Sequence, residues 1–468
     1  MHRQNACFGQ SHLPRGGVSR AGRVSSLTPV TRVGREHDRE ILRLAVPAFL
    51  ALVAEPMFLL ADSAIVGHLG TPELAALGIA SAVMGTLVSL CIFLAYGTTA
   101  SVARQVGAGR TRAALTQGVD GLWLATGLGL LASLVTVPLT RPLVRLFGPG
   151  PLVEDQAVVY LRIALLGAVP LLLMLAATGV LRGLQDTRTP LLVAVAANGA
   201  NVVLNLVLVY GVGAWEGLGL AGSAWGTLLA QLGAATALVW VVVRGARRTR
   251  ATLRPDLAGI RAAGRAGVPL ILRTLMLRAS LLVMTYAAAR LGDADLATMQ
   301  LALTIWTFLA FTLDAVAIAA QAITGRYLGA SDAAGARAVT RRMERWGWAS
   351  GVVTGAALAA LSPFLGGLFT SDPDVLELLV PVLLVAALAQ PLAGIVFVLD
   401  GVLIGAGDAV YLAWAQLVTL ALFAPVALAV GDRGLTWLWV AFGVLFMGGR
   451  AVTLLVRARG DAWLRLGA

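Results

Sequence analysis

Residues 179–190 read GVLRGLQDTRTP, and residues 401–412, a further 222 positions along the chain, read GVLIGAGDAVYL. Both stretches begin with Gly-Val-Leu. Both then have a second glycine, Gly183 or Gly405, and an aspartate, Asp186 or Asp408, at matching positions. Chance matches are common between segments rich in Leu and Ala, but shared loop residues at one fixed spacing are not. The two stretches therefore indicate an internal repeat.

The repeat extends over most of the chain. The same spacing aligns further identical residues of several types. It places Val46-Pro47 on Val268-Pro269, Arg104 with Gly107-Ala108 on Arg326 with Gly329-Ala330, and Leu146-Phe147 on Leu368-Phe369. We infer that the chain consists of two homologous halves.

The composition places both halves in a lipid bilayer. Of the 468 residues, 58% are hydrophobic and only 13% are charged, against about 25% charged in soluble domains. A membrane-spanning helix needs about 20 apolar residues. Runs of this length occur about twelve times, near residues 41–67, 73–99, 117–140, 157–181, 190–212, 218–243, 267–290, 296–325, 346–369, 377–404, 409–431 and 435–456. The arginines lie between these runs rather than on one face, so we expect no nucleic-acid partner.

These features predict an all-α integral membrane protein with two six-helix bundles. Because six is even, both halves insert in the same orientation, related by a pseudo-twofold axis along the membrane normal with a central cleft between them. Repeats of this kind are typical of alternating-access transporters. The expected segments are a disordered basic cytoplasmic tail (1–38), the first bundle (39–243), a cytoplasmic linker (244–266), the second bundle (267–457) and a cytoplasmic tail (458–468).

Arginine placement predicts the orientation. The arginines cluster in alternate connections, which are the amino-terminal tail, Arg110 and Arg112, Arg182 and Arg188, Arg244 to Arg265, Arg337 to Arg345, and Arg457 to Arg465. The intervening connections hold few basic residues. Since basic loops stay on the cytoplasmic side, we expect a multi-pass protein of the cell inner (plasma) membrane with both termini in the cytoplasm.

Ionisable residues inside apolar runs are candidate functional groups, because a charge at bilayer depth is costly without a partner or a cavity. Asp62 and Glu55 lie seven residues apart in the first run, on nearly one helical face. The repeat spacing places Met284 opposite Asp62 in the second half, so the repeated fold alone does not require this aspartate. We predict that Asp62 binds a proton or a coupling ion, and keep Glu55 as a substrate or gating candidate.

Amide and hydroxyl side chains form a polar stripe in the first half. Asn198, Asn201 and Asn205 share one helical face, and Thr227 and Gln231 form an i, i+4 pair in the next run. Such residues often hydrogen-bond between membrane helices. They are also suited to hold a proton with Asp62, or a sodium ion through their oxygens. Asn198 and Gln231 are further substrate or gating candidates.

The second half carries its own charges. Arg273 and Arg278 lie in the seventh run, Asp314 in the eighth and Asp400 in the tenth. We expect structural Arg–Asp pairing, which lowers the cost of burial, with substrate or gate contacts as the alternative. The sequence contains no zinc-protease motif, nucleophile elbow, phosphate loop or Cys-x-x-Cys. We therefore predict neither an enzyme nor a metal or organic cofactor.

Several of these stretches together resemble the multidrug and toxic compound extrusion (MATE) transporters. They are LLADSAIVGHLG at 59–70, LRGLQDTRTP at 181–190, GLAGSA at 219–224 and, resembling the DNA-damage-inducible F branch, DGVLIG at 400–405 with the helix that carries Arg450. The resemblance covers residues 38 to 460. It implies a V-shaped pair of bundles that exchanges organic, often cationic, drug-like molecules for protons or sodium.

The resemblance also assigns roles to residues of the first half. Asp62 matches the coupling aspartate of the family, and Asn201 and Thr227 match its polar partners. Asn205 stands where many members of this branch have a second aspartate, so coupling would depend more heavily on Asp62. The seventh run lacks the acidic residue of another branch at Met276 and Leu277.

Three functions remain open from the sequence. The first is proton- or sodium-coupled export of a small organic substrate by a monomer in the lipid bilayer, with Asp62 protonation driving the rearrangement. The second is a flippase for a lipid or lipid-linked precursor, for which Arg273 and Arg278 would contact phosphates. The third is a non-transporting membrane scaffold, in which Asp62→Asn would have no effect.

Overall fold

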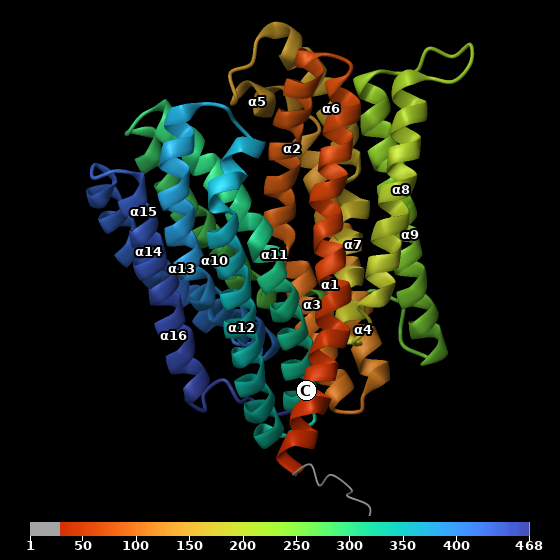
Figure 1. Cartoon of the computed structure of the whole chain (residues 1–468). Coiled ribbons are helices and arrows are strands. Elements are labelled where there is room, and N and C mark those ends of the chain that lie inside the picture. The colour runs from red at the N-terminus through yellow and green to blue at the C-terminus, as the bar shows by residue number, and fades with distance from the viewer. Residues whose placement is uncertain (1–28, 468) are drawn as a thin grey trace, which may run out of the picture.

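The computed structural model describes residues 29–467, and these residues form helices without a strand. The first half contains α1 (Pro29–Gly67), α2 (Thr71–Cys91), α3 (Phe93–Gly107), α4 (Thr111–Thr136), α5 (Thr140–Arg145), α6 (Pro151–Leu166), α7 (Ala168–Gly183), α8 (Arg188–Tyr210) and α9 (Leu220–Arg248). The second half contains α10 (Leu257–Ala289), α11 (Asp293–Gly329), α12 (Ala333–Leu365), α13 (Pro373–Gly405), α14 (Ala409–Gly431), α15 (Leu435–Ala441) and α16 (Gly448–Arg459). The two halves stand side by side, with the carboxyl terminus at the lower end in Figure 1.

The expected class of about twelve membrane spans is confirmed. Within residues 29–467, 11 helical segments are long and apolar enough to cross a bilayer, and the bent pair α6–α7 brings the number to 12. Three spans are not simple helices: α2 and α3 break at Ile92, α6 and α7 meet at Gly167 at 46°, and a π-helix (Phe442–Met447) joins α15 to α16.

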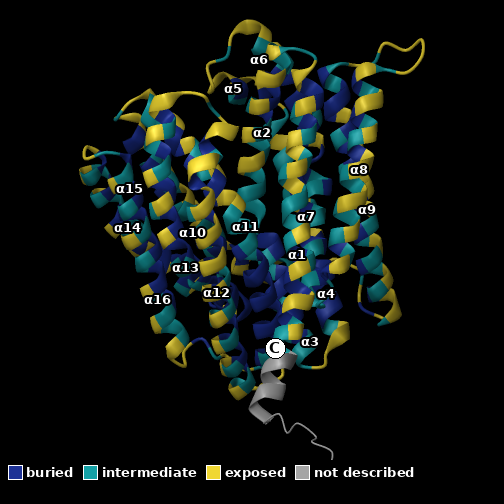
Figure 2. Cartoon of the chain, in the orientation of Figure 1, coloured by how far each residue is buried: buried dark blue, intermediate teal, exposed yellow. Residues whose placement is uncertain are grey.

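The outer surface suits a lipid environment. Large apolar side chains are exposed on many helices, including Leu60 (70%), Leu134 (75%) and Leu388 (82%). Figure 2 shows exposed residues along the outer helices over their length. Such an extended apolar surface would be unfavourable in water, so it is expected to face the acyl chains.

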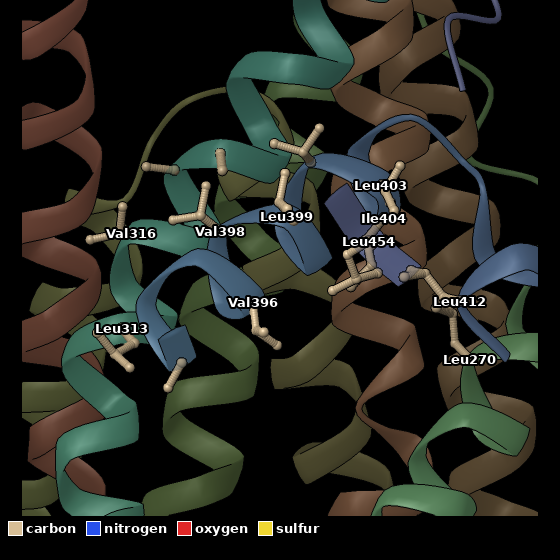
Figure 3. Packing of buried hydrophobic residues seen from close by; sticks show 14 of the residues in the cluster. Leu270, Leu313, Val316, Val396, Val398, Leu399, Leu403, Ile404, Leu412 and Leu454 are labelled. Carbon is tan, nitrogen blue, oxygen red and sulfur yellow. The ribbon is translucent and has the colours of Figure 1, made fainter. Parts of the chain in front are cut away.

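Helix α13 forms the core of the second half. It packs against α11, α12 and α16, and its residues Leu399 and Leu403 are fully buried. Figure 3 shows these side chains among those of neighbouring helices. Helices α1 and α3 of the first half pack against α11 of the second, so α11 forms the main contact between the halves.

The two halves approach each other closely at a pair of glycines that the repeat spacing relates. A Cβ atom added to Gly107 of α3 would lie 1.9 Å from the backbone oxygen of Arg326, and one added to Gly329 of α11 would lie 1.9 Å from that of Arg104. Each glycine lies four residues after another small residue, Ala103 in α3 and Gly325 in α11. Small residues at this spacing let two membrane helices approach closely. We call this contact the glycine crossing.

Arginine side chains beside the glycine crossing bind the turns after α7 and α13, which lie in the repeated stretches 179–190 and 401–412. Arg104 donates to the backbone oxygens of Ala406 (2.9 Å) and Gly467 (2.7 Å). Arg326 donates to Gln185 Oε1 (3.1 Å) and forms an ion pair with Glu40. The two turns, after α7 and after α13, therefore bind the arginine of the opposite half.

The helices extend beyond the predicted segment boundaries. Residues 1–28 of the predicted disordered tail lie outside the described residues, but 29–38 are helical, which corrects that expectation. Arg342 and Trp346 of α12 donate to Asp38 at 2.7 Å and 2.8 Å, which anchors this extension. The linker is also shorter than predicted, because α9 ends at Arg248 and Asp256 caps α10 by accepting from Ala258 N.

Replacement of Gly107 by alanine is expected to destabilise the protein. The added Cβ overlaps the Arg326 oxygen, and such overpacking costs about 1–3 kcal/mol. Gly78→Ala is the matched control, because a Cβ on Gly78 has no atom within 4 Å. The thermal midpoint of the purified protein in detergent should fall for Gly107→Ala alone, and equal midpoints for the two variants would contradict the close crossing.

Candidate transport site

A buried aspartate lies at the centre of the polar groups of the first half. Asp62 on α1 is 3% exposed, and its Oδ1 accepts hydrogen bonds from Asn205 Nδ2 of α8 and Ser223 Oγ of α9, both at 2.7 Å. Asn205 and Ser223 are fully buried. Three helices that meet at this point therefore provide one carboxylate and two neutral donors.

Hydrogen bonds continue from Asp62 toward a cavity. Asn205 Nδ2 also donates to Asn201 Oδ1 (3.1 Å), and Asn201 Nδ2 donates to Thr227 Oγ1 (3.1 Å). Asn201 and Thr227 line a cavity of about 300 Å³, which we call the first cavity. The structure therefore brings together all four predicted ion-coupling residues, although their role in coupling stays a prediction.

The substrate or gating candidates of the first half also line the first cavity. Glu55 and Gln231 lie in its wall. So does Asn198, whose Nδ2 donates to the backbone oxygen of Ala54 at 2.9 Å, across α8 and α1.

A different charge arrangement occupies the second half. Arg273 of α10 donates to Asp400 Oδ2 of α13 at 2.6 Å, and Arg450 of α16 donates to the same oxygen. Arg273 is 8% exposed, Arg450 is 6% exposed and Asp400 is 7% exposed. All three line a cavity of about 360 Å³, which we call the second cavity. The predicted Arg–Asp pairing is thus observed for Arg273 and Asp400.

The remaining charged candidates, Asp314 and Arg278, also line the cavities. Asp314 lines both cavities, and no arginine in the described part of the chain lies within 4.0 Å of its carboxylate. Arg278 lines the second cavity and donates to Ser89 Oγ of α2, in the other half. It therefore pairs with a hydroxyl rather than with the expected aspartate.

The two buried aspartates differ in the charge of their partners. Across residues 37–467, no arginine or histidine nitrogen lies within 4.0 Å of the Asp62 carboxylate, and its hydrogen-bond donors are neutral. Asp400 lies between two guanidinium groups. Proton uptake by Asp62 leaves a neutral group among neutral partners, whereas proton uptake by Asp400 leaves two buried cations without a counter-ion. The arrangement therefore suits Asp62, and not Asp400, to exchange a cation.

Sequence reasoning missed residues that the structure places in these sites. Ser223 is four residues before Thr227, on the same face of α9, and this spacing could have identified it. Arg450 was noticed only within the family resemblance, although an arginine inside the last apolar run is itself a signal. Arg182 and Tyr96 line the first cavity, but Arg182 lay in a predicted loop and Tyr96 has no charge.

Two homologous helical halves with polar cavities at membrane depth define a polytopic membrane transport protein. The MatE family model matches this chain twice, at residues 47–207 and 269–429, with the 222-residue spacing of the repeat. The chain therefore belongs to the MatE family of multidrug and toxic compound extrusion transporters, which confirms the resemblance.

Relatives in a plant and in bacteria show the same relationship. The chain is 30% identical to Protein DETOXIFICATION 44, chloroplastic, of Arabidopsis thaliana, over 88% of this chain and 80% of that protein. It is also 30% identical to the DNA damage-inducible protein F of Escherichia coli, over 89% and 91%. The Vibrio cholerae MATE transporter VcmN in its bent form has the same fold, with a TM-score of 0.83 at 21% identity over 93% of this chain and 98% of that one.

The two aspartates should respond differently to neutralisation. Asp400→Asn removes the counter-ion of two buried arginines, and breaking such a pair costs about 3–5 kcal/mol. Asp62→Asn keeps an oxygen that can accept from Asn205 and Ser223, so the loss should stay below about 1 kcal/mol. Thermal unfolding in detergent measures both variants. An equal loss of stability would show that Asp62 is held by charge in the same way as Asp400.

Proposed function

We propose that this protein is a secondary active transporter that exports organic compounds by antiport with protons or sodium, with Asp62 as the coupling site. The observation that carries the proposal is the burial of Asp62 among neutral donors, without an arginine partner among the described residues. A carboxylate in such surroundings gains most from binding a cation. Its position beside the first cavity links cation binding to the substrate pathway.

Either coupling ion fits the surrounding oxygen atoms. A proton would neutralise Asp62 directly. A sodium ion would take oxygens from Asp62, Asn201, Ser223 and Thr227, and from Asn205, whose buried Oδ1 has no hydrogen-bond partner. Because Asn205 replaces a second carboxylate, the group has a single negative charge. We therefore infer that this group of oxygens binds one monovalent cation per transport cycle.

Alternating access would open and close the glycine crossing. In the present conformation α3 and α11 are in contact at Gly107 and Gly329, which closes the end of the molecule that carries the carboxyl terminus. Access from that end requires α3 and α11 to separate. Separation would release Arg104 from Ala406 and Arg326 from Gln185. These hydrogen bonds at the two repeated turns would therefore stabilise the closed conformation.

We further propose that the closed end faces the cytoplasm. Arg110 and Arg112 follow the end of α3, and Arg337 to Arg345 lie in the first turns of α12, which follows α11. Such a concentration of basic residues favours the cytoplasmic side. The multi-pass chain would then lie in the cell inner membrane with its carboxyl terminus inside.

One observation favours a second function. Arg273, Arg278 and Arg450 gather in the second cavity, as expected of a protein that flips phosphate-bearing lipids. In that case the compound moved would be a lipid or a lipid-linked precursor, and soluble dyes would not be transported.

The antiport proposal is tested by dye movement in proteoliposomes. Transport of the cationic dye ethidium and of the anionic dye carboxyfluorescein is measured under an imposed pH gradient, and separately under a sodium gradient, for the wild type, Asp62→Asn and the surface control Asp155→Asn. We expect dye transport by the wild type and by the control to follow one of the gradients. The Asp62→Asn rate should fall at least about tenfold, because the loss of one buried ionic contact costs about 1.4 kcal/mol or more.

The outcomes separate the hypotheses. Gradient-driven transport that persists in Asp62→Asn would contradict the coupling role. If the wild type moves neither dye but equilibrates a fluorescent phospholipid between leaflets, the flippase function is supported instead.

A further inference from the structure

We propose that the second cavity is a binding site for an anionic group, such as a carboxylate or phosphate, carried on an aromatic or apolar body, and that Arg278 is the residue that contacts this anion. The inference rests on the transport function proposed above and deepens it by naming a substrate class. That class differs from the cationic compounds that the family resemblance implies.

The charges of the second cavity carry the first part of the argument. Arg273, Arg278 and Arg450 line it together with two acidic residues, Asp314 and Asp400, which leaves one positive charge in excess. Asp400 is shared by two of the arginines. Asp314 also faces the first cavity, where Arg182 and Glu55 carry opposite charges, so that the two cavities together have four arginines and three carboxylates. The excess positive charge is therefore not balanced locally, and an anion would balance it.

Arg278 is free to contact a ligand. Within residues 37–467 it has no carboxylate within 4.0 Å, and its side chain donates to the hydroxyl of Ser89 on α2. Arg273 and Arg450 are instead held in place by Asp400. A guanidinium presents a planar set of donors that matches a carboxylate or phosphate, so an anion could bind Arg278 in place of Ser89.

The walls of the cavity favour an aromatic or apolar body. Trp306, Phe442 and Phe446 line it, with ring centroids 5.2 Å apart for Trp306 and Phe442 and 4.9 Å apart for the stacked pair Phe442 and Phe446. Arg450 lies 5.6 Å from the Phe446 centroid. A volume of about 360 Å³ is in the range of small-molecule sites.

The π-helix between α15 and α16 forms part of this site. It spans Phe442–Met447, and its residues Phe442, Phe446 and Met447 line the cavity, followed three residues later by Arg450. Single π-turns inside α-helices are concentrated at functional sites. The irregular turn thus occurs at the residues that would contact the ligand.

The arginine cluster is specific to the second half. At the repeat spacing, Arg273, Arg278, Asp400 and Arg450 correspond to Ala51, Pro56, Thr178 and Leu228. The repeated architecture forms without these charges in the first half, so folding alone does not require them in the second. This asymmetry points to a function of the second cavity. In the same way, the second half has no counterpart of Asp62, which points to a function of Asp62 in the first half.

Equilibrium binding to the purified protein, without any gradient, tests the inference. The probes are 1-naphthoate and 1-naphthylmethylamine, which share a ring system and carry opposite charges. We expect the wild type to bind the naphthoate at least about tenfold more tightly than the amine. Arg278→Gln should lower naphthoate affinity about tenfold or more and leave amine affinity unchanged.

Arg290→Gln is the matched control. Arg290 follows the last turn of α10, outside both cavities, and pairs with Asp432 at the surface, so this variant should bind like the wild type. A thermal midpoint for Arg278→Gln equal to that of the wild type shows that the variant is folded. Equal or tighter amine binding by the wild type, or unchanged naphthoate binding by Arg278→Gln, would overturn the proposal.

A competition arm distinguishes the two sources of such an anion. If dioctanoyl phosphatidate displaces the naphthoate, the site accepts a lipid phosphate; if it does not, the site selects a small organic anion. Either result supports anion recognition at Arg278. Because no gradient is involved, failure of this assay rejects the anion site alone, whereas gradient-driven dye transport that persists in Asp62→Asn rejects the coupling proposal alone.

Discussion

The arrangement of this molecule depends on one constraint, which is the cost of placing a carboxylate at membrane depth without a cationic partner. Asp62 meets that constraint with hydrogen bonds from Asn205 and Ser223, which bring α1, α8 and α9 together. These neutral partners stabilise the carboxylate only in part, because a guanidinium would interact with it far more strongly. The remaining stabilisation is available to a bound cation, which supports the coupling role that we propose for Asp62.

The internal repeat provides the scaffold, and departures from the repeat provide the functional chemistry. The glycine crossing and the two turns that hold Arg104 and Arg326 obey the repeat closely. The polar sites do not, because Asp62 corresponds to Met284 in the second half and Arg273 corresponds to Ala51 in the first. We propose that this symmetric frame rocks about its axis, with the cation bound in one half and the substrate in the other.

Much of the fold followed from the sequence, because hydropathy and the fixed spacing of Gly, Pro, Arg and Asp are local signals. Helical periodicity likewise placed Asn201 and Asn205 on one face, and in the structure Asn205 donates to both Asp62 and Asn201. The pairing of Arg450 with Asp400 and the contact of Arg278 with Ser89 could not be predicted, because they depend on how helices distant in the sequence rotate against each other. The helical extension at residues 29–38 was missed because its partners, Arg342 and Trp346, lie 300 residues away.

Infrared difference spectroscopy of the carboxyl stretching band tests the central claim most directly, since a protonated carboxyl absorbs apart from an ionised one. Spectra of the purified protein are compared for the wild type, Asp62→Asn and Asp400→Asn while the pH is raised or sodium is added. The account predicts a protonated carboxyl band that declines with either treatment, is missing in Asp62→Asn and persists in Asp400→Asn. A titrating band that is unchanged in Asp62→Asn, or one that disappears in Asp400→Asn, would contradict it.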